Sequence, residues 1–63
     1  MSWYDDHINA VADRFAKKCA EAPNKTKFIK RLRQDLPSMG WNEQEIDRII
    51  KRIERKIAKE AEA

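Results

Sequence analysis

The last third of the chain carries the clearest pattern of apolar and polar positions. Isoleucine recurs there every three or four residues, at Ile46, Ile49, Ile50, Ile53 and Ile57. This spacing places the five side chains on one face of an α-helix. Asn42 is a good N-cap, and Glu45 follows three residues later, as the acidic member of a capping box does. The pattern predicts a helix over about residues 42–61.

A second apolar pattern begins near the start of the chain. It steps by four and three residues through Tyr4, Ile8, Val11, Phe15, Cys19 and Ala22. This pattern predicts a helix over about residues 2–22, and Ser2 followed by Asp5 fits a capping box at its start. Ala12 and Ala16 lie beside the apolar face and would let another helix approach closely.

The middle of the chain predicts a shorter helix, over about residues 25–36. Its apolar face consists of Phe28, Ile29, Leu32 and Leu36. Pro23 ends the preceding helix, and either Asn24 or Thr26 is suited to be the next N-cap.

Pro37 and Gly40 shape the connection to the last helix. Pro37 disfavours helical backbone at Leu36, so we expect the middle helix to end there. Gly40 suits a positive φ in the tight connection that follows. Two short connections between three apolar-faced helices predict an all-α fold over residues 1–63: a small three-helix bundle with two long helices flanking a shorter middle one. Because the middle helix is short, part of a long helix is expected to present apolar surface to another molecule.

The composition agrees with one small helical domain and bounds its properties. The chain has 63 residues, with one glycine and two prolines. A domain of this size buries about 60% of its unfolded surface, which leaves little room for a deep pocket. The single Cys19 excludes an intrachain disulfide. The sequence contains no secretory or transmembrane hydrophobic run, so we expect a cytoplasmic protein with no membrane partner.

The reactive residues do not form a catalytic or metal-binding pattern. The only histidine, His7, and the only cysteine, Cys19, are separated on one predicted helix by about 18 Å of axial rise. Asp5, Asp6 and His7 are consecutive, so a helix would point them in different directions and disfavour a metal site. Phosphate-binding loops, zinc patterns and nucleophile elbows are lacking. We therefore predict a protein that is not an enzyme and needs no cofactor.

The net charge of +3 is distributed unevenly along the chain. Residues 1–13 carry three acidic and no Lys or Arg side chains, whereas residues 14–33 carry eight basic and one acidic. Lys27, Lys30 and Arg31 face outward on the predicted middle helix. Such a face suits the phosphates of DNA or RNA, and it equally suits a helix that only needs a hydrated surface.

The last helix carries a second set of basic residues. Arg48, Arg52, Arg55 and Lys59 are predicted to lie opposite the isoleucines. Like charges four residues apart each cost an isolated helix about 0.2–0.5 kcal/mol, so this face either binds an anionic partner or is a solvated surface. A glycine-containing turn before the helix is similar to that of helix–turn–helix proteins. Leu36 is large for that motif, however, and Glu43, Glu45 and Asp47 would repel phosphates.

Met39, Gly40 and Trp41 resemble the Met-Gly-Phe loop of ubiquitin-associated domains. The resemblance covers these three residues and the helix that follows them. That helix is longer than in the family, and the short third helix of the family is missing. The resemblance therefore implies no function for this chain.

Trp3 and His7 lie four residues apart on the first helix, away from its apolar face and next to Arg14. Tryptophan is a frequent anchor in protein interfaces, and the alternative is that Trp3 packs over the end of the bundle. The candidate partner-binding residues are thus Trp3, His7, Arg14, Lys27, Lys30, Arg31, Arg48, Arg52, Arg55 and Lys59.

Two functional hypotheses follow from these patterns. The leading one is a small non-enzymatic binding or regulatory protein, of the phage- or plasmid-encoded inhibitor type, that docks a helix face on a larger protein. The alternative is a nucleic-acid-binding module that uses the basic middle segment and the outer face of the last helix. A homodimer that buries the isoleucine face, or an engineered helical miniprotein, would also fit the sequence.

Overall fold

The chain folds into three helices that follow one another with short connections. The computed structural model describes the backbone of residues 2–62 and the side chains of residues 2–60, so residues 1 and 63 of the predicted domain lie outside the described part. The elements are α1 (Trp3–Glu21), α2 (Lys25–Asp35), a short 3₁₀ helix η1 (Leu36–Met39) and α3 (Glu43–Glu62). The predicted all-α bundle with a shorter middle helix is confirmed.

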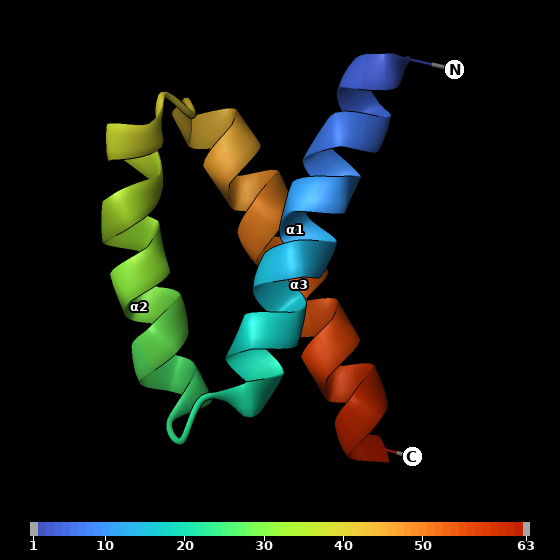
Figure 1. Ribbon diagram of the computed structural model, residues 1–63, viewed down its shortest axis with the longest axis vertical. Coiled ribbons are helices and arrows are strands. Elements are labelled where there is room, and N and C mark those ends of the chain that lie inside the picture. The colour runs from blue at the N-terminus through green and yellow to red at the C-terminus, as the bar shows by residue number, and fades with distance from the viewer. Residues whose placement is uncertain (1, 63) are drawn as a thin grey trace.

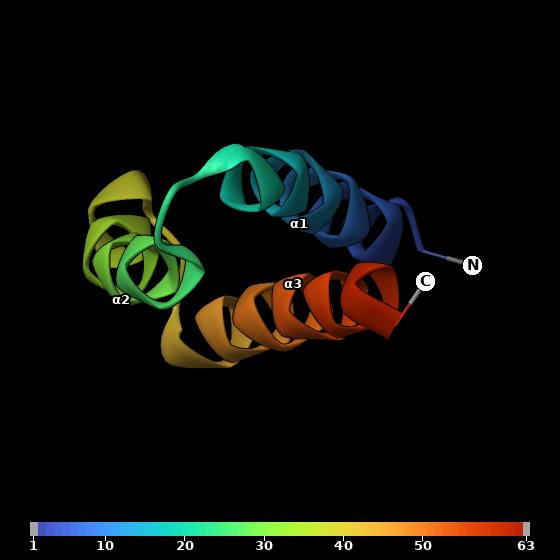
Figure 2. The same ribbon diagram turned by 90° about the horizontal axis from the view of Figure 1, so that it is seen from below.

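The two long helices form the body of the molecule. In Figure 1, α1 and α3 run in the same direction and cross as an X, whereas α2 runs the opposite way along one side. Figure 2 shows α1 and α3 as two layers with α2 beside both, and both chain ends on the side away from α2. The Cα positions extend over 30 × 26 × 15 Å. A molecule this thin places its binding surfaces on its outer faces and in the furrows between helices.

The hydrophobic core lies where α1 crosses α3. Its largest fully buried side chains are Ile8, Leu36, Ile49, Ile50, Ile53 and Cys19. Ala12 and Ala16 belong to this core, with 0% and 7% of their surface exposed, and their small size lets the two helices approach. The buried face of α1 is therefore centred on the alanines and not on the predicted line through Tyr4 and Phe15. Tyr4 is exposed, and its hydroxyl donates a hydrogen bond to the Glu45 carboxylate.

The isoleucine face of α3 is covered within a single chain. Ile46 has 7% of its surface exposed, and Ile53 none. Ile57, one turn further on, is half-buried against the same core. This face is consequently not available for the homodimer that the sequence left open.

Side chains cap the first two helices at their N-termini. The Ser2 hydroxyl accepts a hydrogen bond from the Tyr4 N–H at 3.2 Å. The Asn24 side-chain oxygen accepts one from the Lys27 N–H at 3.0 Å, so Asn24 is the N-cap of α2 and Thr26 is not. Both caps satisfy N–H groups that have no partner inside the helix.

Asn42 and Glu45 form the predicted capping box at the start of α3. The Asn42 side chain accepts from the Glu45 N–H at 2.8 Å, and the Glu45 carboxylate accepts from the Asn42 N–H at 2.9 Å. The hydrogen bond from Asn42, followed by that from the Tyr4 hydroxyl, lowers the pKa of the Glu45 carboxyl. The start of α3 is thus tied to its own first turn and to α1.

Replacing Asn42 with alanine is expected to lower the free energy of unfolding by about 0.5–2 kcal/mol, because the Glu45 N–H loses its acceptor. The exposed neighbour Gln44 serves as the control, since its replacement by alanine should change the free energy by less than about 0.5 kcal/mol. Urea unfolding followed by circular dichroism measures both variants. Equal effects would show that the capping box does not stabilise the fold.

The connection between α2 and α3 differs from the prediction at Leu36. This residue has helical backbone, with φ −57° and ψ −40°, and it begins η1 although Pro37 follows it. Pro37 occupies the start of η1, where its missing N–H is not needed, and the complete burial of Leu36 offsets the unfavourable local geometry. Gly40 has the predicted positive φ, 97°, and its N–H donates to the carbonyls of Leu36 and Pro37.

Candidate functional site

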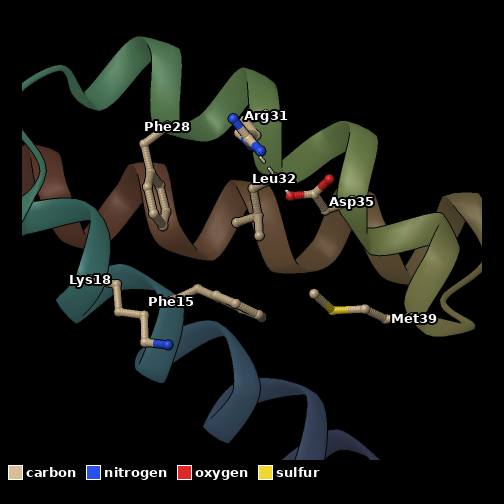
Figure 3. Close-up of a pocket in the computed structure, with 7 residues that line it drawn as sticks. All are labelled: Phe15, Lys18, Phe28, Arg31, Leu32, Asp35 and Met39. Carbon is tan, nitrogen blue, oxygen red and sulfur yellow. Dashed lines mark ion pairs between the residues drawn. The ribbon is translucent and has the colours of Figure 1, made fainter.

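An open groove between α1 and α2 has a largely apolar lining. It has a volume of about 250 Å³. The lining residues are Phe15, Lys18, Phe28, Arg31, Leu32, Asp35 and Met39. Figure 3 shows Phe15 and Lys18 on α1, Met39 at the end of η1 and the other residues on α2, with α3 passing behind them. We call this feature the α1–α2 groove.

The apolar lining of the groove remains partly accessible to solvent. Leu32 is almost completely buried, whereas Phe15 and Phe28 are half-buried at its sides. Met39 exposes 56% of its surface. Phe28 and Leu32 are one helical turn apart, so the apolar lining continues along α2 with a rise of about 6 Å. The prediction that part of a long helix presents apolar surface is consistent with the half-buried Phe15 of α1, whereas the rest of the apolar lining belongs to α2 and η1.

The charged residues of the groove follow a pattern that occurs once on each wall. Lys18 comes three residues after Phe15 on α1, and Arg31 comes three residues after Phe28 on α2. This spacing puts each cation beside its aromatic ring along the helix surface. The repeat of Phe, any residue, Lys and then Lys or Arg is the sequence signal that would have identified the groove. The helical periodicity alone predicts both phenylalanines in the core, and it gives no signal for Lys18 or Met39.

Arg31 and Asp35 form the one ion pair within the groove. Their side chains approach to 3.9 Å, and 83% of the Arg31 side chain is exposed. Exposed pairs of this kind contribute at most about 1 kcal/mol, because water screens the charges and two long side chains must be ordered. The Arg31 guanidinium can therefore leave Asp35 for a stronger anionic partner at little cost.

Trp3, the predicted anchor, is exposed and does not pack over the end of the bundle. It presents 79% of its surface to solvent. The His7 ring lies close to two tryptophans, with its centroid 6.5 Å from that of Trp3 and 5.8 Å from that of Trp41, and it stacks on Trp41. Arg14 follows on the same side of α1 and is also exposed. Trp3, His7 and Arg14 thus form a continuous side of α1 that leads to Lys18 at the groove.

Arg48 and Arg52 form ion pairs with α1 that the sequence pattern of α3 did not predict. Arg48 pairs with Asp5 of α1 at 3.0 Å, and Arg52 pairs with Asp13 at 2.9 Å. Lys56 reaches the same Asp13 carboxylate at 3.0 Å. Helical periodicity places the arginines relative to their own isoleucines but does not show the acids of the crossing helix, so these ion pairs were not predicted. Asp5 was expected in a capping box with Ser2, but the Ser2 hydroxyl accepts from the Tyr4 N–H and the Asp5 carboxylate pairs with Arg48 instead.

The Asp13 carboxylate makes the stability of the fold depend on pH. Hydrogen bonds from Arg52 and then Lys56 lower the pKa of Asp13 below its ordinary value. A carboxyl whose pKa is lower in the folded state stabilises fully above its unfolded pKa of about 3.9, and this stabilisation is lost as the pH falls through the folded pKa.

Replacing Asp13 with asparagine should therefore lower the free energy of unfolding at neutral pH by less than about 1 kcal/mol, because the pair is partly exposed. The difference from the wild type should shrink as the pH falls below about 4. Urea unfolding at several pH values measures it, with Asp6→Asn as the control. Asp6 is exposed and makes no ion pair among the described residues. A difference that does not depend on pH would contradict this assignment.

The remaining predicted cations lie on two separate parts of the surface. Lys27, Lys30 and Arg31 line one shallow depression on α2, together with Gln34 and Asp35. Arg55 lines a different depression with the paired arginines of α3, and Lys59 is exposed on the same helix. The basic residues of α2 and α3 therefore do not line a common depression.

Cys19 and His7 do not belong to one catalytic or metal-binding site. Cys19 is completely buried, as predicted, and its thiol donates to the Lys25 carbonyl at 3.8 Å. Burial raises the pKa of this thiol, which keeps it protonated and unreactive at neutral pH. Within the described residues, no three His, Cys, Asp or Glu side chains gather closely enough to hold a metal ion.

Comparisons with known proteins identify no relative of this chain. No family model matches the chain, and neither a curated protein nor a solved structure matches it. Of the helices described here, none combines the length and apolar character needed to cross a membrane. The geometry of the surface is therefore the basis for any functional assignment.

Proposed function

We propose that this chain is a small, non-catalytic binding protein that regulates or inhibits a larger protein by docking on it in a stoichiometric complex. The observation that carries the proposal is the open apolar α1–α2 groove with cations on both walls. Apolar surface that is left open and rimmed by polar residues is typical of interaction sites.

The side of α1 next to the groove extends the proposed docking surface. Trp3, His7, Arg14 and Lys18 follow one another at steps of four, seven and four residues, which keeps them on one side of the helix. Tryptophan and arginine are the residues that most often supply binding energy at protein interfaces. An interface that combines this side of α1 with the groove has an aromatic anchor at one end and an apolar hollow at the other.

Site-specific photo-crosslinking in the producing cells tests this proposal. A benzophenone amino acid at position 39, in the groove, is expected to crosslink to one larger protein, whereas the same group at position 54 should not. Glu54 is exposed on α3 and lines none of the described hollows, so it is a matched control. The captured protein is then purified, and light scattering should show a complex with one copy of each chain. Absence of a protein adduct at position 39 would overturn the proposal.

A second candidate function is nucleic-acid binding through α2. Lys27 and Lys30 are exposed, form no ion pair among the described residues, and share a depression with Arg31. Three such cations on one helix suit a phosphate backbone, and binding would then weaken steeply with salt. The α3 face supports this candidate less well than the sequence suggested, because Arg48 and Arg52 are paired with α1.

Charge reversal separates the two candidate functions. The double variant Lys27→Glu/Lys30→Glu should abolish retention on a DNA or RNA column if α2 binds phosphates, and it should leave the position-39 crosslink unchanged if the groove binds a protein. Neither lysine lines the groove. Unchanged, salt-sensitive retention of the variant would exclude these lysines as phosphate ligands.

A further inference from the structure

We infer that the α1–α2 groove receives an acidic amphipathic helix of the partner protein. This inference rests on the proposed docking function and names the chemistry of the segment that would be bound. It follows from three properties of the groove: its apolar lining, the nature of its walls, and the sign of the charges along both sides.

The apolar lining requires apolar side chains on the ligand. Phe15 and Phe28 lie on opposite walls, and Leu32 follows Phe28 on the α2 wall, where it is buried (Figure 3). Met39 closes one end with a flexible, polarizable side chain that adapts to ligands of different shapes. A row of leucine-like side chains would fill the hollow of about 250 Å³ and cover these four residues.

The walls of the groove favour a helical ligand over an extended one. Both walls are α-helices, so their backbone N–H and C=O groups already bond to one another. An extended peptide would find no sheet edge here to pair with its own backbone, whereas a helix satisfies its backbone internally. Apolar residues at every third or fourth position of a helix would also match the rise of about 6 Å between Phe28 and Leu32.

The charges on the two walls favour an acidic ligand. Lys18 stands on the α1 wall and Arg31 on the α2 wall, each beside its phenylalanine. Asp35 is the single acid in the groove, and it is held only by the weak contact with Arg31. Carboxylates on both flanks of the apolar face of the ligand would therefore meet a cation on either side, and electrostatic complementarity of this kind directs partner choice.

The same charges disfavour a second copy of this chain as the occupant. A symmetric pair of grooves would place Lys18 and Arg31 of one copy against the same cations of the other. Asp5 and Asp13 of α1 offer no substitute, since these two carboxylates pair with Arg48, Arg52 and Lys56.

Titration of the full chain with three synthetic peptides tests the inference. The probes are about 15 residues long, because shorter helices are marginal in water. The first has leucines on one face and glutamates on both flanks, the second has lysines in place of the glutamates, and the third has the composition of the first with the leucines spread around the helix. Fluorescence anisotropy measures affinity, and the Met39 methyl resonance reports binding in the groove.

We expect the first peptide to bind and to shift the Met39 resonance, with the other two binding about tenfold or more weakly. The variant Lys18→Glu/Arg31→Glu should reverse the preference between the first two peptides. The variant Arg55→Glu/Lys59→Glu changes the net charge equally at residues outside the groove, and it should keep the preference. Circular dichroism confirms that both variants are folded.

Other outcomes overturn the inference and separate it from the proposed function. Equal binding of the acidic and basic peptides would exclude the acidic preference. If no peptide binds but the position-39 crosslink still captures a protein, the inference is wrong while the docking function stands. A third outcome would overturn both the inference and the docking function: a single-stranded oligonucleotide shifts the Met39 resonance, and the position-39 crosslink captures no protein. The groove would then bind nucleic acid, because bases also stack on aromatic side chains.

Discussion

Replacing Ile53 with alanine is expected to lower the free energy of unfolding by about 2–5 kcal/mol. Ile53 is completely buried in the core between α3 and its neighbours, so truncation removes apolar contacts and leaves a cavity. A domain of 63 residues has a total stability of only about 3–9 kcal/mol. The variant should therefore lose a large share of its stability, and thermal unfolding followed by circular dichroism should show a clearly lower melting temperature.

The matched control for this prediction is Ile57→Ala, one turn later on the same helix. Ile57 is half-buried, so less apolar surface is lost and solvent can fill the space. The gain in helix propensity from isoleucine to alanine is the same at both positions and cancels in the comparison. An equal loss of stability in Ile57→Ala and Ile53→Ala would contradict the structure, in which Ile53 is more deeply buried than Ile57.

Enlarging Ala12 to leucine is expected to lower the free energy of unfolding by about 1–3 kcal/mol. Ala12 has none of its surface exposed at the crossing of α1 and α3, so three additional carbon atoms must force the helices apart or distort their side chains. Leucine and alanine are both good helix formers, and the change tests packing more than helix propensity. Urea unfolding provides the free energy.

Ala10→Leu is the corresponding change at an exposed position of the same helix. It should alter the free energy of unfolding by less than about 0.5 kcal/mol, because the added side chain meets solvent. A leucine tolerated equally well at positions 10 and 12 would show that the helices do not approach at Ala12. Together the alanine and isoleucine variants locate the α1–α3 contact from both of its sides.

The ion pairs between α1 and α3 change the interpretation of the charge pattern. Viewed alone, α3 carries like charges four residues apart, which suggests a surface kept for an anionic partner. In the folded chain, Asp5 and Asp13 balance Arg48 and Arg52 from the other helix. The free positive charge of the described surface is thereby concentrated on α2 and on the outer side of α1, next to the groove.

The local structure of this protein was predictable from the sequence. The three helices, the Asn42–Glu45 box, the positive φ of Gly40 and the buried isoleucines all depend on residues close together in the chain. Helical periodicity and capping depend on residues a few positions apart, so a short segment of sequence is enough to predict them. Leu36 is the local exception, because its burial against other helices overrides the backbone preference imposed by Pro37.

Only the tertiary structure decided what those helices present to a partner. Phe15 and Phe28 lie on faces that a pattern analysis assigns to the core, and they line an open groove because α2 sits to one side of the α1–α3 crossing. The pattern of α3 alone places Arg48 and Arg52 on an outer face. In the fold they are paired, because Asp5 and Asp13 of the crossing helix α1 lie next to them. The period of a helix determines which residues share a side, whereas the distance and angle between helices determine whether that side is covered.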